Sequence, residues 1–441
     1  MKYYIENFGC QMNEHDMEKV NHLLHSAGHE QAPEMAKADL VIVNTCCIRE
    51  KAEQKFYSRM GRLRAVKRRS GIMIGVTGCI AQLEKETLIE RLPFVNFALG
   101  PSNIDRVCEA VEAVSRKEVF LDFSSNGCTG SMYIRPGQTG KEKAVRAYVT
   151  IMKGCDNYCS YCIVPYVRGR EASRESGDIL EEIRELAGRG IKEVILLGQN
   201  VNSYNRGRED MSFPELLDAV DEIEDIERVR FVTSHPKDLS PALIERFGRL
   251  RSLCEQIHLP FQSGSDTVLR LMNRGYTVRE YRAKVELLKK TCPEIAISSD
   301  CIVGFPGEEE TDFEETMQLV EDVRFDGLFS FCFSPRKYTA AAGLSDRVPE
   351  EVSLERLHRL QAVQKAITQQ GHQRLEGKRV EVLVEGVSKN SRDELAGRTR
   401  SNSIVNFKGN RDLVGKLVEV DVVRGYANSA RGANPLQIKE A

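Results

Sequence analysis

Residues 144–370 repeat one pattern, in which a short run of β-branched and other apolar residues is followed by a helical stretch. The strand-like runs cover residues 148–152, 194–197, 229–233, 256–260, 296–303 and 327–333. Strands that alternate with helices pair in parallel, because each helix returns the chain to the same edge of the sheet. Six such units predict a partial (β/α)6 barrel with its chemistry at the carboxyl ends of the strands.

Three cysteines follow the first of these strand-like runs within one short loop. They are Cys155, Cys159 and Cys162, in the spacing CxxxCxxC. Three thiols can hold three irons of a four-iron cubane and leave the fourth iron open. A structural zinc site takes four ligands, commonly as two CxxC pairs, and no second pair follows at that spacing. Three thiols cannot all form disulfides, so the spacing predicts an iron–sulfur cluster with an open iron.

The first 122 residues also alternate strand-like and helical runs. Strands are expected at 2–7, 39–44 and 72–76, and helices at 14–27, from residue 49 onward and near 83–91. This order predicts an open parallel α/β sheet, in which ligands bind beyond the carboxyl ends of the strands.

A cysteine stands after each of three strands of this predicted sheet. They are Cys10, Cys46 and Cys79, and a glycine before the first and the third lets the backbone come close. We therefore expect these thiols to meet at one edge and to hold a second cluster, again with one iron free. Cys47 is an alternative ligand, but neighbouring side chains on an extended segment point to opposite faces, which favours Cys46. Cys108 and Cys128 have no comparable partners and are expected to be structural.

The remaining segments divide the chain further. Residues 123–143 are rich in turn formers and are predicted to link a domain at 1–122 to a core at 144–371. Residues 372–441 contain short β-rich runs at 378–385, 402–408 and 417–423, which predict a small β-barrel. From residue 371 onward, 13 Lys and Arg face 9 Asp and Glu, and this basic excess favours an RNA partner.

Composition and the distribution of apolar residues argue against a secreted or membrane-spanning protein. The chain has 441 residues and a formal net charge of −2, so any contact with RNA depends on local basic patches. The run MKYYIE at 1–6 does not show a charged segment followed by an apolar one, so no leader is expected, and no apolar run reaches the length of a membrane span. We expect a cytoplasmic protein without membrane contact, in which the 13 cysteines serve metal binding or catalysis rather than disulfides.

The CxxxCxxC loop, with Tyr161 before its third cysteine, resembles that of the radical S-adenosylmethionine (SAM) superfamily. Along nearly its whole length the chain resembles the methylthiotransferase family of radical SAM enzymes: a three-cysteine domain, a radical SAM barrel and a C-terminal TRAM domain. Within that family it is most similar to members that modify an isopentenylated adenosine in tRNA. The runs that carry this similarity are GCQMN at 9–13, NTC at 44–46, IREKA at 48–52, TSHP at 233–236 and GRTR at 397–400.

The resemblance implies two [4Fe-4S] clusters and SAM as cofactors. Cys155, Cys159 and Cys162 would hold the radical-generating cluster, and the cysteines at 10, 46 and 79 the sulfur-handling cluster. The implied reaction converts N6-isopentenyladenosine at tRNA position 37, next to the anticodon, to its 2-methylthio form. One SAM supplies the methyl group and another the radical, while an electron donor and a sulfur source remain unidentified.

Two other functions stay open on the sequence. Relatives in the same family act on threonylcarbamoyladenosine in tRNA or on a ribosomal protein, although their residues after the first cysteine differ. An iron–sulfur RNA-binding scaffold without turnover is the alternative from another class, and CxxxCxxC argues against it.

Residues near the expected strand ends are the candidate contacts to SAM. They are Tyr161, Gly198, Gln199, Asn200, Ser234, Ser299 and Asp300. Arg398 and Arg400 are the candidate RNA contacts in the basic tail. The run SPRKYT at 334–339 departs from the Arg-Pro-Gly-Thr run of relatives, which leaves the role of Arg336 open. His235 and His258 have no visible partner in the sequence and are not expected to be ligands.

Overall fold

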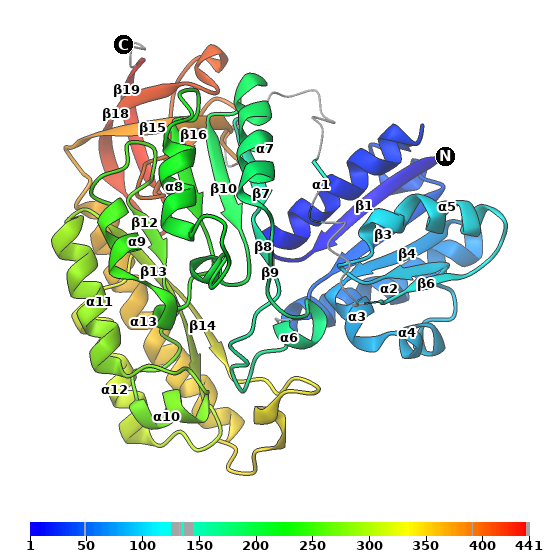
Figure 1. Cartoon of the computed structure of the whole chain (residues 1–441), viewed down its shortest axis with the longest axis horizontal. Helices are drawn as coiled ribbons and strands as arrows, with labels where there is room; N and C mark the ends of the chain where they lie inside the picture. The colour runs from blue at the N-terminus through cyan, green and yellow to red at the C-terminus, as the bar shows by residue number, and fades with distance from the viewer. Residues whose placement is uncertain (48–49, 125–131, 133, 136–143, 390, 438–441) are drawn as a thin grey trace.

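The computed structural model describes residues 1–47, 50–124, 132, 134–135, 144–389 and 391–437. Cys128 and most of the predicted linker lie outside these residues. The chain forms three parts in sequence order: a parallel sheet with helices, an incomplete barrel and a small closed barrel (Figure 1). The predicted α/β architecture is therefore confirmed.

The first part is a six-stranded parallel sheet of order β2-β1-β3-β4-β5-β6. Its strands are β1 (Lys2–Phe8), β2 (Glu30–Gln31), β3 (Leu40–Thr45), β4 (Met73–Gly78), β5 (Phe97–Leu99) and β6 (Phe120–Asp122). Its helices are α1 (Gln11–Ser26), α2 (Glu50–Ser70), α3 (Cys79–Glu84), α4 (Glu86–Arg91) and α5 (Val107–Ser115). Every residue of β3 is buried, as expected for a central strand covered on both faces.

The register of this sheet brings three strand ends to one edge. Phe8 pairs with Thr45, and Thr45 pairs with Gly78, so β1, β3 and β4 end side by side. Two residues separate β1 from α1, β3 is followed by a bend at residue 47, and α3 begins directly after β4. This edge is where the sequence placed the three N-terminal cysteines.

The second part is the partial barrel. Two three-stranded parallel sheets, β7-β10-β11 and β12-β13-β14, are connected by a bridge between Val229 and Leu253. The strands are β7 (Arg146–Thr150), β10 (Glu193–Leu197), β11 (Arg228–Phe231), β12 (Gln256–His258), β13 (Ala296–Val303) and β14 (Gly327–Cys332). The helices are α6 (Val164–Val167), α7 (Ser176–Gly188), α8 (Phe213–Asp221), α9 (Pro241–Arg246), α10 (Asp266–Leu271), α11 (Val278–Thr291), α12 (Glu310–Val323) and α13 (Glu350–Gln373).

The first barrel strand differs from its prediction at 148–152. The parallel ladder runs from residue 146 to 150, and β8 (Met152–Lys153) pairs instead with β9 (Ala172–Ser173) in an antiparallel ribbon. The chain therefore leaves the barrel two residues earlier than apolarity alone suggests. This ribbon lies between the barrel and the first part of the chain (Figure 1), and the CxxxCxxC loop that follows β8 contacts the barrel through Leu271 and Met272.

The N-terminal part packs against the side of the barrel. Met12 of α1 forms one buried cluster with Tyr148 of β7 and with Ile195 and Leu197 of β10. Val167 of α6, from the barrel part, is buried in the core of the N-terminal sheet. Each part thus inserts apolar side chains into the other, and this fixes their relative placement.

The third part is a closed barrel of order β15-β16-β17-β19-β18. Its strands are β15 (Arg379–Val387), β16 (Leu395–Arg398), β17 (Ile404–Phe407), β18 (Leu417–Gly425) and β19 (Ala430–Gln437). It contacts the amino ends of the barrel strands, opposite the end that carries the CxxxCxxC loop (Figure 1). In the part of the chain that the structure describes, no helix is long and apolar enough to cross a membrane.

Candidate active site

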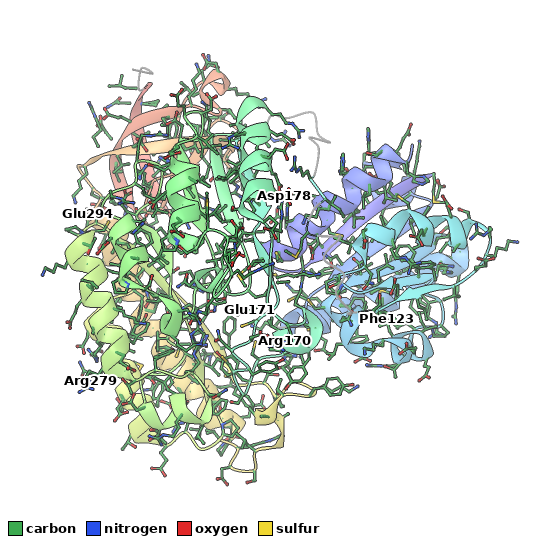
Figure 2. The ribbon with its side chains drawn as sticks, in the orientation of Figure 1. Phe123, Arg170, Glu171, Asp178, Arg279 and Glu294 are labelled. Atoms are coloured by element: carbon green, nitrogen blue, oxygen red, sulfur yellow. The ribbon has the colours of Figure 1, made fainter. Side chains whose placement is uncertain are left out.

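The CxxxCxxC loop follows β8 and is held close to the strand β9 that pairs with it. Gly154 has φ +77°, and a Cβ atom at this position would lie 1.9 Å from the carbonyl oxygen of Arg170. Only glycine permits this approach. The amide of Cys155 then donates to the Gly169 carbonyl at 3.2 Å, and Figure 2 shows Arg170 and Glu171 where the barrel meets the N-terminal part.

Burial dominates the electrostatics of two loop thiols, Cys155 and Cys162. It raises the pKa of Cys155 to about 11 and that of Cys162 to about 12, and the neighbouring Cys159 adds to both shifts. Cys159 itself is 8% exposed. Thiols in such surroundings stay protonated until a metal binds them, because a metal deprotonates its thiol ligands.

Two side chains surround Cys159: Arg274, which the sequence did not single out, and His235, which was not expected to be a ligand. The buried guanidinium of Arg274 donates to the Cys159 sulfur at 3.3 Å and to the Pro260 carbonyl at 2.8 Å. His235 Nε2 lies 3.9 Å from the same sulfur, while its Nδ1 accepts from the Lys237 amide at 3.2 Å, which assigns the ring proton to Nε2. Burial lowers the pKa of His235 to about 2, so the ring is neutral. Both groups aim a donor at one sulfur, as is typical around iron–sulfur clusters.

Polar side-chain atoms without partners collect at three successive strand ends near this loop. The Asn200 Oδ1, Ser234 Oγ and Gln262 Oε1 atoms are buried and have no hydrogen-bond partner among the described residues. They follow β10, β11 and β12 respectively. Orphaned buried polar atoms are costly, and a polar ligand at the mouth would satisfy them. The Asn200 and Gln262 oxygens are acceptors and fit the amino and hydroxyl groups of SAM, and the Ser234 hydroxyl can donate to its carboxylate.

The other candidate SAM residues occupy different positions. The Gln199 side chain accepts from the Gly154 amide and so supports the cluster loop. The Tyr161 hydroxyl receives a hydrogen bond from Arg274 at 3.3 Å, and its ring packs among apolar residues beneath the loop. Gly198 has no room for a side chain, because a Cβ would lie 2.5 Å from Met152.

Ser299 and Asp300 are neighbours on β13 and point to opposite faces of it. Ser299 is fully buried and bonds the backbone of residues 259 and 261 on the helix-covered side. Asp300 faces the barrel interior, where its Oδ2 lies 3.3 Å from His258 Nε2. Of the two, Asp300 is the one that a ligand inside the barrel can reach.

In the N-terminal part, two asparagines connect the segments that carry the cysteines. The Asn13 amide donates to Asn44 Oδ1 at 3.1 Å and to the Thr45 carbonyl at 3.0 Å, and Asn44 donates back to the Asn13 carbonyl at 2.8 Å. Gly78, with φ +96°, passes this pair so closely that a Cβ would lie 2.3 Å from Asn44 Oδ1. These contacts explain the residue types beside the cysteines in the GCQMN and NTC runs.

The predicted N-terminal thiols do meet at the common strand edge. A hydrogen bond from Cys46 lowers the pKa of Cys10 to about 6, and one from Cys47 lowers that of Cys79 to about 7, with the charge of Arg168 contributing to both. Cys79 also lies close enough to Cys10 for their charges to interact. The four thiols therefore form a single group.

The expectation that Cys47 faces away from this group is wrong. Its thiol contacts Cys79, and that hydrogen bond together with burial raises its pKa well above the usual range. The alternation of side chains holds within a strand, but β3 ends at Thr45 and the chain bends at residue 47. Among the described residues, no three His, Cys, Asp or Glu side chains converge tightly enough to hold a single metal ion. A cubane distributes its protein ligands over separate irons and accepts wider spacing.

Arg168 connects the two cysteine groups. It stands six residues after Cys162, directly follows α6, and bonds the Cys79 thiol. Its Nη2 lies 2.9 Å from Asp16 Oδ2, and both side chains are buried. The segment 155–168 thus begins with the cysteines of the barrel part and ends with an arginine that contacts the N-terminal cysteines.

The candidate RNA residues of the tail are engaged within the molecule. Arg400 makes a two-pronged ion pair with Glu255, at 2.7 to 3.0 Å, and donates to the Leu253 carbonyl. Arg398 Nε lies 3.0 Å from Glu385. The GRTR run therefore attaches the third part to the barrel. Contact of these residues with RNA stays a prediction.

Arg336 pairs with Glu53 of α2 at 3.0 Å and so connects the barrel to the N-terminal part.

Three family models match the chain in succession. Residues 2–100 match Uncharacterized protein family UPF0004, residues 149–320 match the Radical SAM superfamily, and residues 373–433 match the TRAM domain. The Radical SAM match, which begins just before the CxxxCxxC loop, supports a [4Fe-4S] cluster and SAM as cofactors.

Curated relatives match over almost the full length. A protein of Geobacter metallireducens named tRNA-2-methylthio-N(6)-dimethylallyladenosine synthase is 50% identical over 97% of this chain and 97% of its own. Proteins of the same name from Syntrophus aciditrophicus and Clostridium botulinum are 49% and 45% identical, over 97% and 98% of this chain and 93% and 96% of theirs.

Solved structures share the fold at low sequence identity. The radical S-adenosylmethionine methyltransferase TsrM from Kitasatospora setae superposes with a TM-score of 0.58 at 13% identity, over 77% of each chain. This likeness extends the comparison to the arrangement of the elements. On the strength of the full-length relatives, this chain belongs to the family of tRNA-2-methylthio-N(6)-dimethylallyladenosine synthases, within the radical SAM methylthiotransferases.

Proposed function

We propose that this protein converts N6-isopentenyladenosine at position 37 of tRNA to 2-methylthio-N6-isopentenyladenosine, using SAM and two [4Fe-4S] clusters. Arg168 is the observation that carries the two-centre reaction, because it stands six residues after Cys162 in the chain and bonds a thiol of the other cysteine group. Family membership supports the substrate. We assign residues 1–122 to the domain of the second cluster and residues 144–371 to the radical SAM core, with a linker between them. The tail from about residue 372 is the RNA-binding domain in this proposal.

Cys155, Cys159 and Cys162 hold the radical-generating cluster in this proposal. When bound, that cluster supplies the electron that cleaves SAM to the radical needed to attack an unactivated C–H bond of adenine. Arg274 places a fixed positive charge at the Cys159 sulfur, which offsets the negative charge of a thiolate-bound cluster in a buried site. Asn200, Ser234 and Gln262 orient SAM through the polar atoms that otherwise lack partners.

Cys10, Cys46 and Cys79 hold the sulfur-handling cluster, and Cys47 donates a hydrogen bond to the Cys79 sulfur. Arg168 supplies the positive charge at this centre, as Arg274 does at the other. Met12 and Val167 pack across the interface and hold the two parts that carry these centres together. The reaction also needs an electron donor and a sulfur source.

Anaerobic turnover with defined RNAs tests this function. The reduced, cluster-loaded protein is incubated with SAM and with tRNA carrying either N6-isopentenyladenosine or threonylcarbamoyladenosine, and the nucleosides are analysed by mass spectrometry. We expect 2-methylthio product from the isopentenylated RNA alone. Product from the threonylcarbamoyl RNA instead would reassign the substrate, and absence of 5′-deoxyadenosine in every reaction would identify a scaffold without turnover.

A further inference from the structure

Three tyrosines form an exposed aromatic cluster beside the CxxxCxxC loop. Tyr158, Tyr166 and Tyr338 are 46%, 45% and 58% exposed, although large aromatic side chains are commonly buried. The ring centroids of Tyr158 and Tyr166 lie 6.5 Å apart at right angles, and those of Tyr166 and Tyr338 lie 6.4 Å apart with an interplanar angle of 32°. The cluster leaves ring faces open to solvent.

Two of these tyrosines have a strained backbone conformation. Tyr158 has φ +46° and Tyr338 has φ +71°, a region that bulky residues rarely occupy. Asn273 fixes the first by donating to the Tyr158 carbonyl at 3.0 Å. The Thr339 hydroxyl donates to the Arg336 carbonyl at 2.7 Å and closes the turn that carries the second. Strain that the surrounding contacts maintain is typical of functional sites.

The cluster belongs to the rim of the candidate active site. Tyr158 directly precedes Cys159, and Tyr166 lies four residues after Cys162. The loop that carries Tyr338 is connected to the same cysteine loop, because the Ala341 amide donates to the Ser160 carbonyl at 2.8 Å. A molecule on the tyrosines is therefore next to the place where SAM is expected.

Positive charge accompanies the rings. Lys337 is exposed, its Nζ lies 5.0 Å from the centre of the Tyr338 ring, and it has no ion pair among the described residues. The side chain of Arg170, 81% exposed, lies in the bend before β9 and pairs with Asp156. Open aromatic faces with a free cation suit nucleotides, whose bases stack while their phosphates take the charge.

We infer that Tyr158, Tyr166 and Tyr338 form a stacking platform for the unpaired bases of the RNA that flank the modified adenosine, with Lys337 at a phosphate. This rests on the proposed function, which supplies RNA as the substrate. An enzyme that modifies a base must take it out of its stack, and stacking of the neighbours on fixed rings offsets that cost. A protein partner is the competing occupant, and the test below distinguishes it.

Binding of an anticodon stem–loop RNA that carries N6-isopentenyladenosine tests the platform. Fluorescence anisotropy with the full, cluster-loaded chain should show about tenfold weaker binding for Y166A and for Y338A, since each loses one stacked base. The slope of affinity against salt should stay unchanged, because stacking releases no counterions. K337Q should instead reduce that slope by about 0.7. Y338F keeps the ring and should bind as the wild type does.

Y57A is the matched control. Tyr57 also has a cation over its ring, with Arg91 at 4.5 Å, but it is only partly exposed and lies on α2 of the N-terminal part. Y57A should leave RNA affinity unchanged, and all variants should keep iron content and RNA-independent cleavage of SAM. Wild-type affinity in a Y166A/Y338A variant, while the wild type binds and modifies the RNA, would overturn the platform alone. That same affinity with loss of reduction by a protein donor would assign the surface to that donor. A wild type that neither binds nor modifies the RNA would overturn the proposed function with it.

Discussion

The two cysteine groups differ in how the fold assembles them. Cys155, Cys159 and Cys162 share one loop, whereas Cys10, Cys46 and Cys79 come from three adjacent strand ends. Burial raises the pKa of the loop thiols at 155 and 162, while hydrogen bonds from other thiols lower that of Cys10 and Cys79.

The difference teaches what each site needs from the rest of the protein. The N-terminal thiols support one another on a rigid sheet edge and require mainly Arg168 as a counter-charge. The loop thiols lie on an irregular segment, so side chains from distant elements must hold them: Gln199 at Gly154 and Arg274 at Cys159. Cluster binding at the loop should therefore be sensitive to substitution of the side chains that hold the loop. At the sheet edge it should be sensitive mainly to substitution of the cysteines themselves.

The largest expected effect is that of C159A. Loss of one of three ligands should remove about half of the iron and abolish 5′-deoxyadenosine formation, because no other described thiol lies in this loop. Iron analysis and chromatography of the anaerobic reaction measure both. The N-terminal cluster should survive, since its ligands belong to another part of the chain. Undiminished cleavage of SAM would show that the loop is not the radical-generating site.

The next effect concerns the choice between Cys46 and Cys47. With Cys46 as ligand, C47S should keep its full iron content, because a hydroxyl still donates to the Cys79 sulfur, and C47A should lose less than half of its activity. The measurement is iron content and product yield of both variants. Loss of a cluster from C47A with an intact C46A would exchange the roles of the two residues.

Much of this comparison could be predicted from the sequence. The CxxxCxxC spacing identified the loop, and the order of strands placed the three N-terminal cysteines at one edge. The orientation of Cys47 could not be predicted, because it depends on where β3 stops and the chain bends. The contacts that Arg274 and Arg400 make within the molecule could not be predicted for another reason. Their partners, Cys159 and Glu255, are more than a hundred residues away, and no local pattern marks such pairs.

A smaller effect is expected from Arg274. R274L removes a charge and a donor from the Cys159 sulfur, which should destabilise the more negative, reduced cluster and lower its midpoint potential. A loss of about 1.4 kcal/mol corresponds to about 60 mV for one electron. Redox titration followed by electron paramagnetic resonance measures the shift, with R274K as the variant that retains the charge. An unchanged midpoint potential of the cluster in R274L would show that Arg274 acts only through packing.

The smallest effect is expected where the third part meets the barrel. R400Q removes the ion pair with Glu255, a partly exposed contact that contributes about 1 kcal/mol. Hydrogen exchange of the amides at 399–403 should accelerate about fivefold, and E255Q should have a similar effect. The salt dependence of tRNA binding should stay the same. A lower salt slope in R400Q but not in E255Q would instead make Arg400 a phosphate contact.

The separate roles of the two cysteine groups are tested most directly by one variant, C46A, assayed for two products in the same anaerobic reaction. The sheet edge that carries Cys46 is distinct from the loop that cleaves SAM, although Arg168 connects them. We predict that C46A loses about half of its iron, still forms 5′-deoxyadenosine, and forms no 2-methylthio nucleoside. Methylthiolated product at the wild-type level would contradict this account, and so would loss of SAM cleavage by a C46A protein that retains the loop cluster.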